Sequence, residues 1–212
     1  MKVYLVVVNT LADWEIGYLT AELHSRRFFR SPDLACEVLK VGIDRTPVTS
    51  MGGMTITPDL TLADVSLAPG DLLLLPGSDA WHEEANAPLL RFAAGALAEG
   101  HKVAAICGAT VGLAQVGALN GRRHASNDLG FLKQSCPAYT GAAQYEDKPA
   151  VRDGNLVTAS GLAALEFSYE VIRMLGVWRE ATADAWYKLH KTREARWYYA
   201  LVESMSTLPS EQ

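Results

Sequence analysis

The stretch "KVAAICGATVGLAQ", from Lys102 to Gln115, joins an apolar run to a series of small residues through one cysteine. The run Lys102–Ile106 predicts a buried β-strand, and the residues after Cys107 predict a helix. Cys107 therefore falls at the carboxyl end of a strand, where open α/β sheets place their ligand sites. Because its neighbours Gly108 and Ala109 are small, a sharp strand-to-helix turn is possible, and the stretch is typical of a nucleophile elbow.

Apolar runs and amphipathic segments alternate along the chain on both sides of this turn. The alternation predicts an α/β fold, a three-layer sandwich with helices on both faces of a mostly parallel central sheet. Val3–Val8 is the first predicted strand, and Asp13 is the predicted N-cap of the helix that follows it. Further strands are predicted within Ala35–Ile43 and Asp71–Leu75, hairpins at Gly52–Gly53 and Asp153–Gly154, and helices over Ala87–Gly100 and Leu162–Leu175.

The composition fits one globular domain, since 49% of the 212 residues are hydrophobic and 20% are charged. We expect this domain over residues 1–176 and a helical, aromatic-rich C-terminal extension of it over residues 177–212. Several large apolar side chains of the extension lie near helical spacing, so we expect them to pack against the domain or against a twofold partner. These side chains are Trp186, Leu189, Trp197, Leu201 and Met205.

The charge and the cysteine pattern argue against several classes of partner. The net charge of −5 is dispersed along the chain, which disfavours binding to nucleic acid or to a membrane surface. The first apolar run, Val3–Val8, is too short for a signal-peptide core or a membrane span. Cys36, Cys107 and Cys136 show no CxxC or Cys/His ligand spacing. We therefore expect no disulfide, metal or cofactor, and a reducing, cytoplasmic location.

Two other segments are predicted to meet Cys107 at the same edge of the sheet. The strand that ends in "LLLLPGS" brings the backbone N–H groups of Gly77 and Ser78 there, and with Gly108 they predict an oxyanion hole. Glu15 lies in the first turn of the helix after the first strand, from which its carboxyl group can reach the thiol. The helix N-terminus is expected to lower the pKa of Cys107. The alternatives are a buried, inert Cys107 and a Glu15 that only complements the helix dipole.

Together, the first strand with Glu15, the "LLLLPGS" turn, the elbow "AAICGAT" and the closing "GNLVTASGLAALEFSYEVIRMLG" resemble the ThiJ/PfpI superfamily over Met1 to Gly176. The resemblance implies a flavodoxin-like fold of the class I glutamine amidotransferase type. It also implies a hydrogen bond between Glu15 and Cys107, and a homodimer without a metal. Members of the superfamily include intracellular proteases or amidases, glyoxalases and deglycases, chaperones, isonitrile hydratases and oxidation-sensing stress proteins.

The histidines depart from the patterns of the superfamily. Gly108 stands where the protease-like branch has a histidine, and Asn127 stands where another branch has one. His124 precedes Asn127 by three residues, and on a strand this odd offset turns it to the opposite face. His82 and Trp81, which follow the predicted oxyanion turn, are candidates for the lining of the pocket. The sequence therefore secures no Cys-His pair.

Two main functions are left open by these residues. In the first, Cys107 attacks a small electrophilic substrate and Glu15 acts as general acid or base, in an amidase-like hydrolysis, a hydration or a glyoxalase-type reaction. Amide hydrolysis is disfavoured without a histidine, because the leaving amine needs an acid. In the second, the protein is a non-enzymatic stress protein or chaperone whose cysteine senses oxidation.

Overall fold

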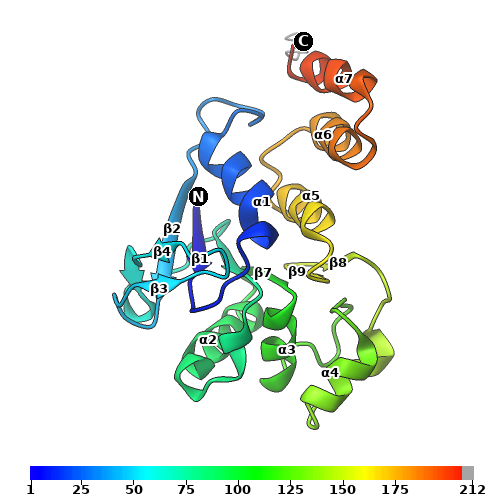
Figure 1. The fold of residues 1–212 in the computed structure, drawn as a ribbon. Helices are drawn as coiled ribbons and strands as arrows, with labels where there is room; N and C mark the ends of the chain where they lie inside the picture. The colour runs from blue at the N-terminus through cyan, green and yellow to red at the C-terminus, as the bar shows by residue number, and fades with distance from the viewer. Residues whose placement is uncertain (207–212) are drawn as a thin grey trace.

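The computed structural model describes residues 1–206, and its centre is a seven-stranded sheet with the order β5-β2-β1-β6-β7-β9-β8 (Figure 1). The neighbouring strands pair in parallel except for β8, which pairs antiparallel with β9. The predicted α/β fold with a mostly parallel sheet is therefore confirmed. The strands are β1 (Lys2–Val6), β2 (Glu37–Gly42), β5 (Leu60–Thr61), β6 (Leu72–Leu75), β7 (Lys102–Ile106), β8 (Ala150–Asp153) and β9 (Leu156–Ala159).

Helices cover both faces of this sheet. Helices α1 and α5 lie on one face and α2 and α3 on the other, and α6 and α7 continue beyond α5 (Figure 1). No helix within residues 1–206 has the length and apolar composition needed to cross a membrane. The helices are α1 (Asp13–Ser25), α2 (Ala87–Ala98), α3 (Gly108–Gln115), α4 (Leu129–Ser135), α5 (Ala164–Leu175), α6 (Glu180–Thr192) and α7 (Ala195–Ser206).

The sheet separates two apolar cores because successive side chains of a strand point to opposite faces. In β1, Val3 and Leu5 belong to the core under α1 and α5, whereas Tyr4 and Val6 belong to the core under α2 and α3. A strand that is buried on both faces needs an uninterrupted apolar sequence. This requirement explains the runs "VYLVVV" in and after β1 and "LLLL" in β6.

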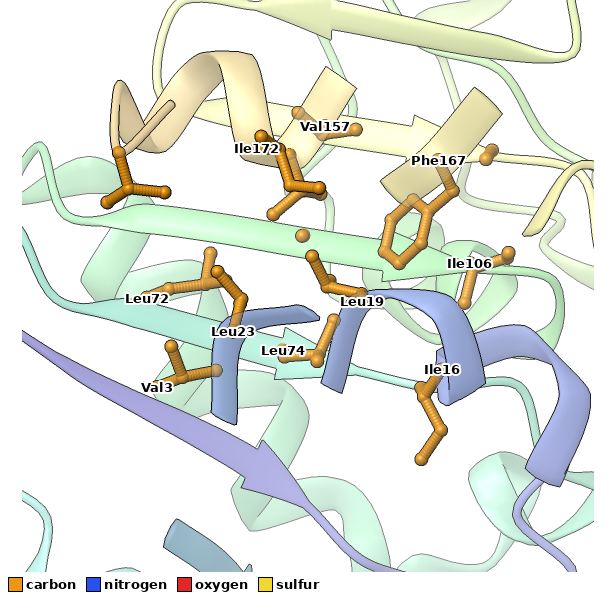
Figure 2. Packing of buried hydrophobic residues seen from close by; sticks show 14 of the residues in the cluster. Val3, Ile16, Leu19, Leu23, Leu72, Leu74, Ile106, Val157, Phe167 and Ile172 are labelled. Carbon is orange, nitrogen blue, oxygen red and sulfur yellow. The ribbon is translucent and has the colours of Figure 1, made fainter. Parts of the chain in front are cut away.

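A row of aliphatic side chains holds α1 on the sheet (Figure 2). Ile16, Leu19 and Leu23 recur at helical spacing and pack in one cluster with Leu74 of β6 and Phe167 of α5. Each of these side chains is at least nine-tenths buried. The packing fixes the first turn of α1 beside the carboxyl ends of the strands, which is the edge where the predicted site residues lie.

The start of α1 differs from the prediction. Asp13 is the first residue of the helix, and the cap position is taken by Ala12, which makes no side-chain capping bond. Asp13 Oδ2 instead accepts a hydrogen bond of 2.6 Å from the N–H of Gly52. Gly52 lies in the turn of the predicted hairpin, which is confirmed as the antiparallel pair β3 (Val48–Thr49) and β4 (Thr55–Ile56). The side chain of Asp13 therefore ties this hairpin to α1.

The closing hairpin and helix follow the prediction, with a difference at the junction between them. Strands β8 and β9 form the antiparallel hairpin, and Asp153 pairs with Leu156 across its turn. The helix predicted from Leu162 begins only at Ala164. Leu162 is 99% exposed because it lies in the loop before the helix.

Helix α6, which lies in the predicted C-terminal extension, packs on α1 and α5. Trp186 is 1% exposed and lies edge-on to the rings of Tyr18 and Trp178. Its Nε1–H donates a hydrogen bond of 3.0 Å to the buried carboxyl group of Glu22 in α1. Leu201 of α7 is also buried. Residues 207–212 of the predicted extension lie outside the described residues.

Replacement of Trp186 by alanine is expected to lower the free energy of unfolding by about 3–5 kcal/mol, because it leaves a cavity and removes a hydrogen-bond donor from Glu22. Trp14→Ala is the matched control: the Trp14 side chain is 57% exposed, so its loss should cost less than about 1 kcal/mol. Urea unfolding measures both variants. Equal stability of the two would show that α6 contributes little to the fold.

Candidate active site

Cys107 occupies a strained turn between β7 and α3. Its backbone angles are φ 57° and ψ −124°, which a residue other than glycine adopts only at a cost of about 1–3 kcal/mol. Two neighbouring segments hold it there. The N–H of Cys107 donates a 3.0 Å hydrogen bond to the carbonyl of Ala159 at the end of β9. The carbonyl of Cys107 accepts hydrogen bonds from the N–H and the hydroxyl of Thr110, at 3.0 and 2.6 Å. The half-buried sulfur therefore stands at the apex of an elbow.

Glu15 reaches the sulfur from the first turn of α1. Its side chain is 1% exposed, and a β-carbon on Gly161 would lie within 3 Å of both its Oε1 atom and the Cys107 sulfur, so the two side chains are close neighbours. Its Oε2 atom accepts a hydrogen bond of 2.6 Å from the N–H of Gly77 after β6. Burial raises the pKa of the Glu15 carboxyl, while the donors of Gly77 and Cys107 act to lower it. The structure therefore brings Glu15 and Cys107 to the same edge of the sheet.

Two glycines make this close approach possible. A β-carbon on Gly77 would lie 2.4 Å from Glu15 Oε2 and 2.7 Å from the β-carbon of Cys107. A β-carbon on Gly161 would lie 2.7 Å from the Cys107 sulfur and 2.8 Å from Glu15 Oε1. The sequence analysis missed Gly161, although it follows β9, the strand that neighbours β7 in the sheet. Its place just beyond the carboxyl end of that strand is the signal that could have found it.

Asn127 takes the position beside the sulfur where one branch of the superfamily was expected to have a histidine. Its Nδ2 atom donates a hydrogen bond of 3.3 Å to the sulfur of Cys107. Its Oδ1 atom accepts hydrogen bonds of 2.8 Å from the N–H of Gly161 and of 3.3 Å from the hydroxyl of Ser160. Because the oxygen is occupied by these donors, the amide orientation is fixed with its N–H₂ group toward the sulfur.

The predicted oxyanion hole needs one correction. The N–H of Gly77 is directed at Glu15, so it is not free to bind a developing oxyanion. The N–H of Gly108 faces the sulfur of Cys107. The Ser78 side chain holds its own turn, because its hydroxyl donates to the carbonyl of Asn9 at 2.6 Å and accepts from the N–H of Ala80 at 2.9 Å. Gly77 therefore leaves the predicted oxyanion hole, and Ser78 and Gly108, whose amide lies next to the sulfur, remain its candidate donors.

The two remaining histidine candidates have different positions. His124 is fully buried, with hydrogen bonds of 2.6 Å to the hydroxyl of Tyr139 and 2.7 Å to the carbonyl of Arg122. It does not line the cavity at Cys107. His82 is exposed and lies in the cavity wall, where no hydrogen bond joins it to Cys107 among the described residues. Within residues 1–206, therefore, no histidine side chain forms a hydrogen bond with the Cys107 thiol.

The sulfur opens on a cavity of about 490 Å³. Trp81 forms part of its wall and is buried, with its Nε1–H donating a 2.7 Å hydrogen bond to the carbonyl of Pro76. Within residues 1–206, no three His, Cys, Asp or Glu side chains converge as metal ligands. The cavity is lined by Ala12, Trp14, Glu15, Met51, Gly77, Ser78, Asp79, Trp81, His82, Cys107, Gly108, Val111, Gly112, Gln115, Asn127, Phe131 and Ser135.

Residues 1–174 match the model of the DJ-1/PfpI family. The chain belongs to this family. A Bacillus subtilis (strain 168) protein named "Uncharacterized protease YoaZ" is 45% identical over 205 residues, which are 97% of this chain and 98% of that protein. The crystal structure of the thiJ/pfpI family protein from Bacillus anthracis is 46% identical, with a TM-score of 0.94 and 97% of both chains covered. The DJ-1 superfamily protein Atu0886 from Agrobacterium tumefaciens is 31% identical, with a TM-score of 0.79 over 91% of this chain and 98% of that one.

The thiol of this DJ-1/PfpI family member differs from the prediction in its ionisation. Burial raises the pKa of Cys107, and the neighbouring Glu15 raises it further, whereas the donors of Asn127 and Gly108 lower it. The prediction that the helix N-terminus lowers the pKa of Cys107 is therefore wrong, because burial raises this pKa more than the hydrogen-bond donors lower it. Burial raises the pKa of Cys36 and Cys136 as well. What distinguishes Cys107 is its strained turn, its polar contacts and its cavity.

Gly161→Ala is expected to slow alkylation of Cys107 by iodoacetamide at least about tenfold, because a methyl group at that position overlaps both the sulfur and Glu15. Gly17→Ala is the matched control, since a β-carbon there meets nothing within 4 Å. Mass spectrometry of the Cys107 peptide gives both rates. An unchanged rate in Gly161→Ala would contradict the close packing at the sulfur.

The pH dependence of the same alkylation tests which groups favour and which oppose ionisation of the Cys107 thiol. A thiol whose pKa is raised forms thiolate only at higher pH, so the alkylation rate at Cys107 should climb with pH through a midpoint above the ordinary thiol range. Asn127→Ala removes a donor that favours the thiolate, and its midpoint should move to still higher pH. Asn120→Ala, whose side chain instead accepts from Thr140, is the control. A downward shift in Asn127→Ala would refute this assignment.

Proposed function

We propose that Cys107 is the nucleophile of an enzyme that acts on a small electrophilic substrate, with Glu15 as its proton carrier. The observation that supports this most strongly is the strained elbow, which presents the sulfur to a cavity while a buried carboxyl group contacts it. A strained backbone persists only where its surroundings hold it, and such positions concentrate at functional sites. A thiol kept only for packing needs neither the strain nor the carboxyl.

Glu15 and Cys107 act as one titrating pair in this proposal. Two adjacent anions repel each other, so near neutral pH the pair carries one proton and one negative charge. The donor of Gly77 favours the charge on the carboxyl group, while the donors of Asn127 and Gly108 favour it on the sulfur. Transfer of the proton from the thiol to Glu15 produces the attacking thiolate without adding net charge to the buried site.

The reaction begins when this thiolate adds to an electrophilic carbonyl carbon. The oxygen of the substrate then becomes negative, and the amides of Ser78 and Gly108 are placed to stabilise it. With an aldehyde, Glu15 returns the proton to that oxygen and a hemithioacetal forms. With an activated acyl group, Glu15 protonates the departing group, and water then hydrolyses the remaining thioester to release the acid and the free thiol. Because Asn127 stands where a histidine could have carried a proton, we assign the proton transfer to Glu15, whose charge raises the pKa of the thiol.

Because the pair has a single proton to transfer, some reactions are favoured over others. Expulsion of an amine from a peptide needs a strong acid at the leaving nitrogen, whereas addition to an aldehyde or hydrolysis of an activated acyl group needs less. We therefore favour glyoxalase-like, deglycase-like or activated-acyl chemistry over cleavage of ordinary peptides, even though the Bacillus subtilis relative carries the name of a protease. A small-molecule substrate and a homodimer complete the proposal.

A second function is supported by the same contacts. Oxidation of Cys107 to a sulfinate would place oxygen atoms beside the Glu15 carboxyl and the Gly108 amide, which can donate hydrogen bonds to them. A non-enzymatic oxidation-sensing stress protein or chaperone would use the sulfur in this way. Burial of the thiol and its raised pKa slow the first step of oxidation, which is why we rank this function second.

The test is turnover of two small electrophiles, methylglyoxal and p-nitrophenyl acetate, with intact-mass detection of adducts. Cys107→Ser should abolish turnover, and Cys136→Ser, which removes a buried thiol outside the cavity, should retain it. Glu15→Gln should keep an alkylatable sulfur but lose turnover by about 100-fold or more, since the neutral Gln amide can neither accept nor return a proton.

Two results would contradict the enzymatic proposal. Turnover in Cys107→Ser within tenfold of the natural protein would remove the cysteine from the reaction. Absence of turnover with both electrophiles, together with selective addition of oxygen atoms to Cys107 by dilute peroxide, would support the oxidation-sensing function in its place.

A further inference from the structure

The cavity is lined by two carboxyl side chains and one histidine, with no lysine or arginine among the described residues. Its ionisable side chains are Glu15 beside the sulfur, Asp79 and His82 in the turn after β6, and the thiol itself. Proteins that bind carboxylates or phosphates ordinarily provide lysine or arginine, because these side chains supply positive charge and several donors. This site has neither, and it carries two carboxyl groups.

Two lysines line a neighbouring groove, and both form ion pairs there. Lys148 and Lys191 line a separate groove that shares Asn127 with the cavity. The ammonium group of Lys148 binds Glu146 at 2.6 Å, and that of Lys191 binds Glu166 at 2.6 Å. These lysines therefore have carboxylate partners of their own outside the cavity.

The rim of the cavity is apolar. Three large side chains from three separate elements lie there, each substantially exposed: Trp14 of α1 at 57%, Met51 of the β3-β4 turn at 42%, and Phe131 of α4 at 51%. Single exposed apolar residues are common on protein surfaces, but convergence of three on one opening marks a binding surface. Inside the rim, Trp81 presents its ring carbons, since its N–H is bonded to the carbonyl of Pro76.

We infer that this cavity takes neutral or cationic electrophiles that carry an apolar group, and that it discriminates against anions through Asp79. The inference rests on the proposed function, because it assumes that the substrate reacts at Cys107. The apolar rim covers the non-reacting part of the substrate, and the reacting carbonyl lies at the sulfur. An anionic group in the same cavity would lose hydration, find no cationic partner, and face the carboxylate of Asp79.

The preference can be measured without knowledge of the natural substrate. The probes are iodoacetamide, which is neutral, iodoacetate, which is an anion of similar size, and N-benzyl iodoacetamide, which adds an aromatic group. Alkylation rates at Cys107 are followed by mass spectrometry and divided by the rates of the same probes with N-acetylcysteine. This normalisation removes the intrinsic reactivity of each probe. We expect iodoacetate to be disfavoured by about fivefold or more relative to iodoacetamide, and less so at high salt.

Two variants assign the effect to residues. Asp79→Asn should raise the rate of iodoacetate relative to iodoacetamide by about two- to fivefold, whereas Asp33→Asn, which changes an exposed carboxylate outside the cavity, should not. Phe131→Ala should remove the advantage of N-benzyl iodoacetamide over iodoacetamide. Tyr199→Ala, which removes a 70% exposed aromatic ring on α7, should keep it.

The outcomes separate this inference from the proposed function. Normalised rates that are equal for the three probes, or a ratio unaffected by Asp79→Asn, would overturn the inference while Cys107 remained a reactive nucleophile. A sulfur that reacts with none of the probes, at any pH at which the protein stays folded, would overturn the proposed function and the inference with it.

Discussion

The carboxyl group of Glu15 is buried between the N–H of Gly77 and the sulfur of Cys107. A buried carboxyl is expensive to ionise unless donors surround it, so every group around Glu15 is constrained. Gly77 and Gly161 must lack side chains, and Asn127 must hold its amide toward the sulfur. The contact also sets how many protons the pair holds, since a thiol and a carboxyl group in contact do not both carry a negative charge near neutral pH. The chemistry proposed for the protein follows from that single pair.

The parallel sheet is what brings these groups together. Strands β1, β6, β7 and β9 are neighbours in that order, and each contributes one part of the site from its carboxyl end. The loop after β1 leads to Glu15, β6 leads to Gly77, β7 to Cys107 and β9 to Gly161. Because the strands are buried on both faces, the two apolar cores set their register and spacing. The stability of the fold and the geometry of the site therefore depend on the same strands.

The sequence predicted those parts of the site that lie at recognisable strand ends. Cys107 and Glu15 could be paired because both follow apolar runs. The ring of His124 does lie away from the cavity, but not for the predicted reason, since residues 124–127 form no strand. The sequence could not show that Glu15 engages the amide of Gly77, since hydrogen-bond partners depend on tertiary distances. It also gave the wrong direction for the thiol pKa, because the position before a helix is visible in a sequence but the extent of burial is not. Gly161 was not predicted because its role lies in the absence of a side chain, and its place after β9 was the signal that pointed to it.

The central claim is that the charge of Glu15 controls the ionisation of Cys107. Thiolate absorbance in the ultraviolet, titrated against pH and corrected with the Cys107→Ser protein, tests it most directly when the natural protein is compared with Glu15→Gln. Loss of the carboxylate removes a charge that raises the thiol pKa, so the account predicts that Cys107 in Glu15→Gln ionises at lower pH. An unchanged midpoint, or a midpoint at higher pH, would contradict the account.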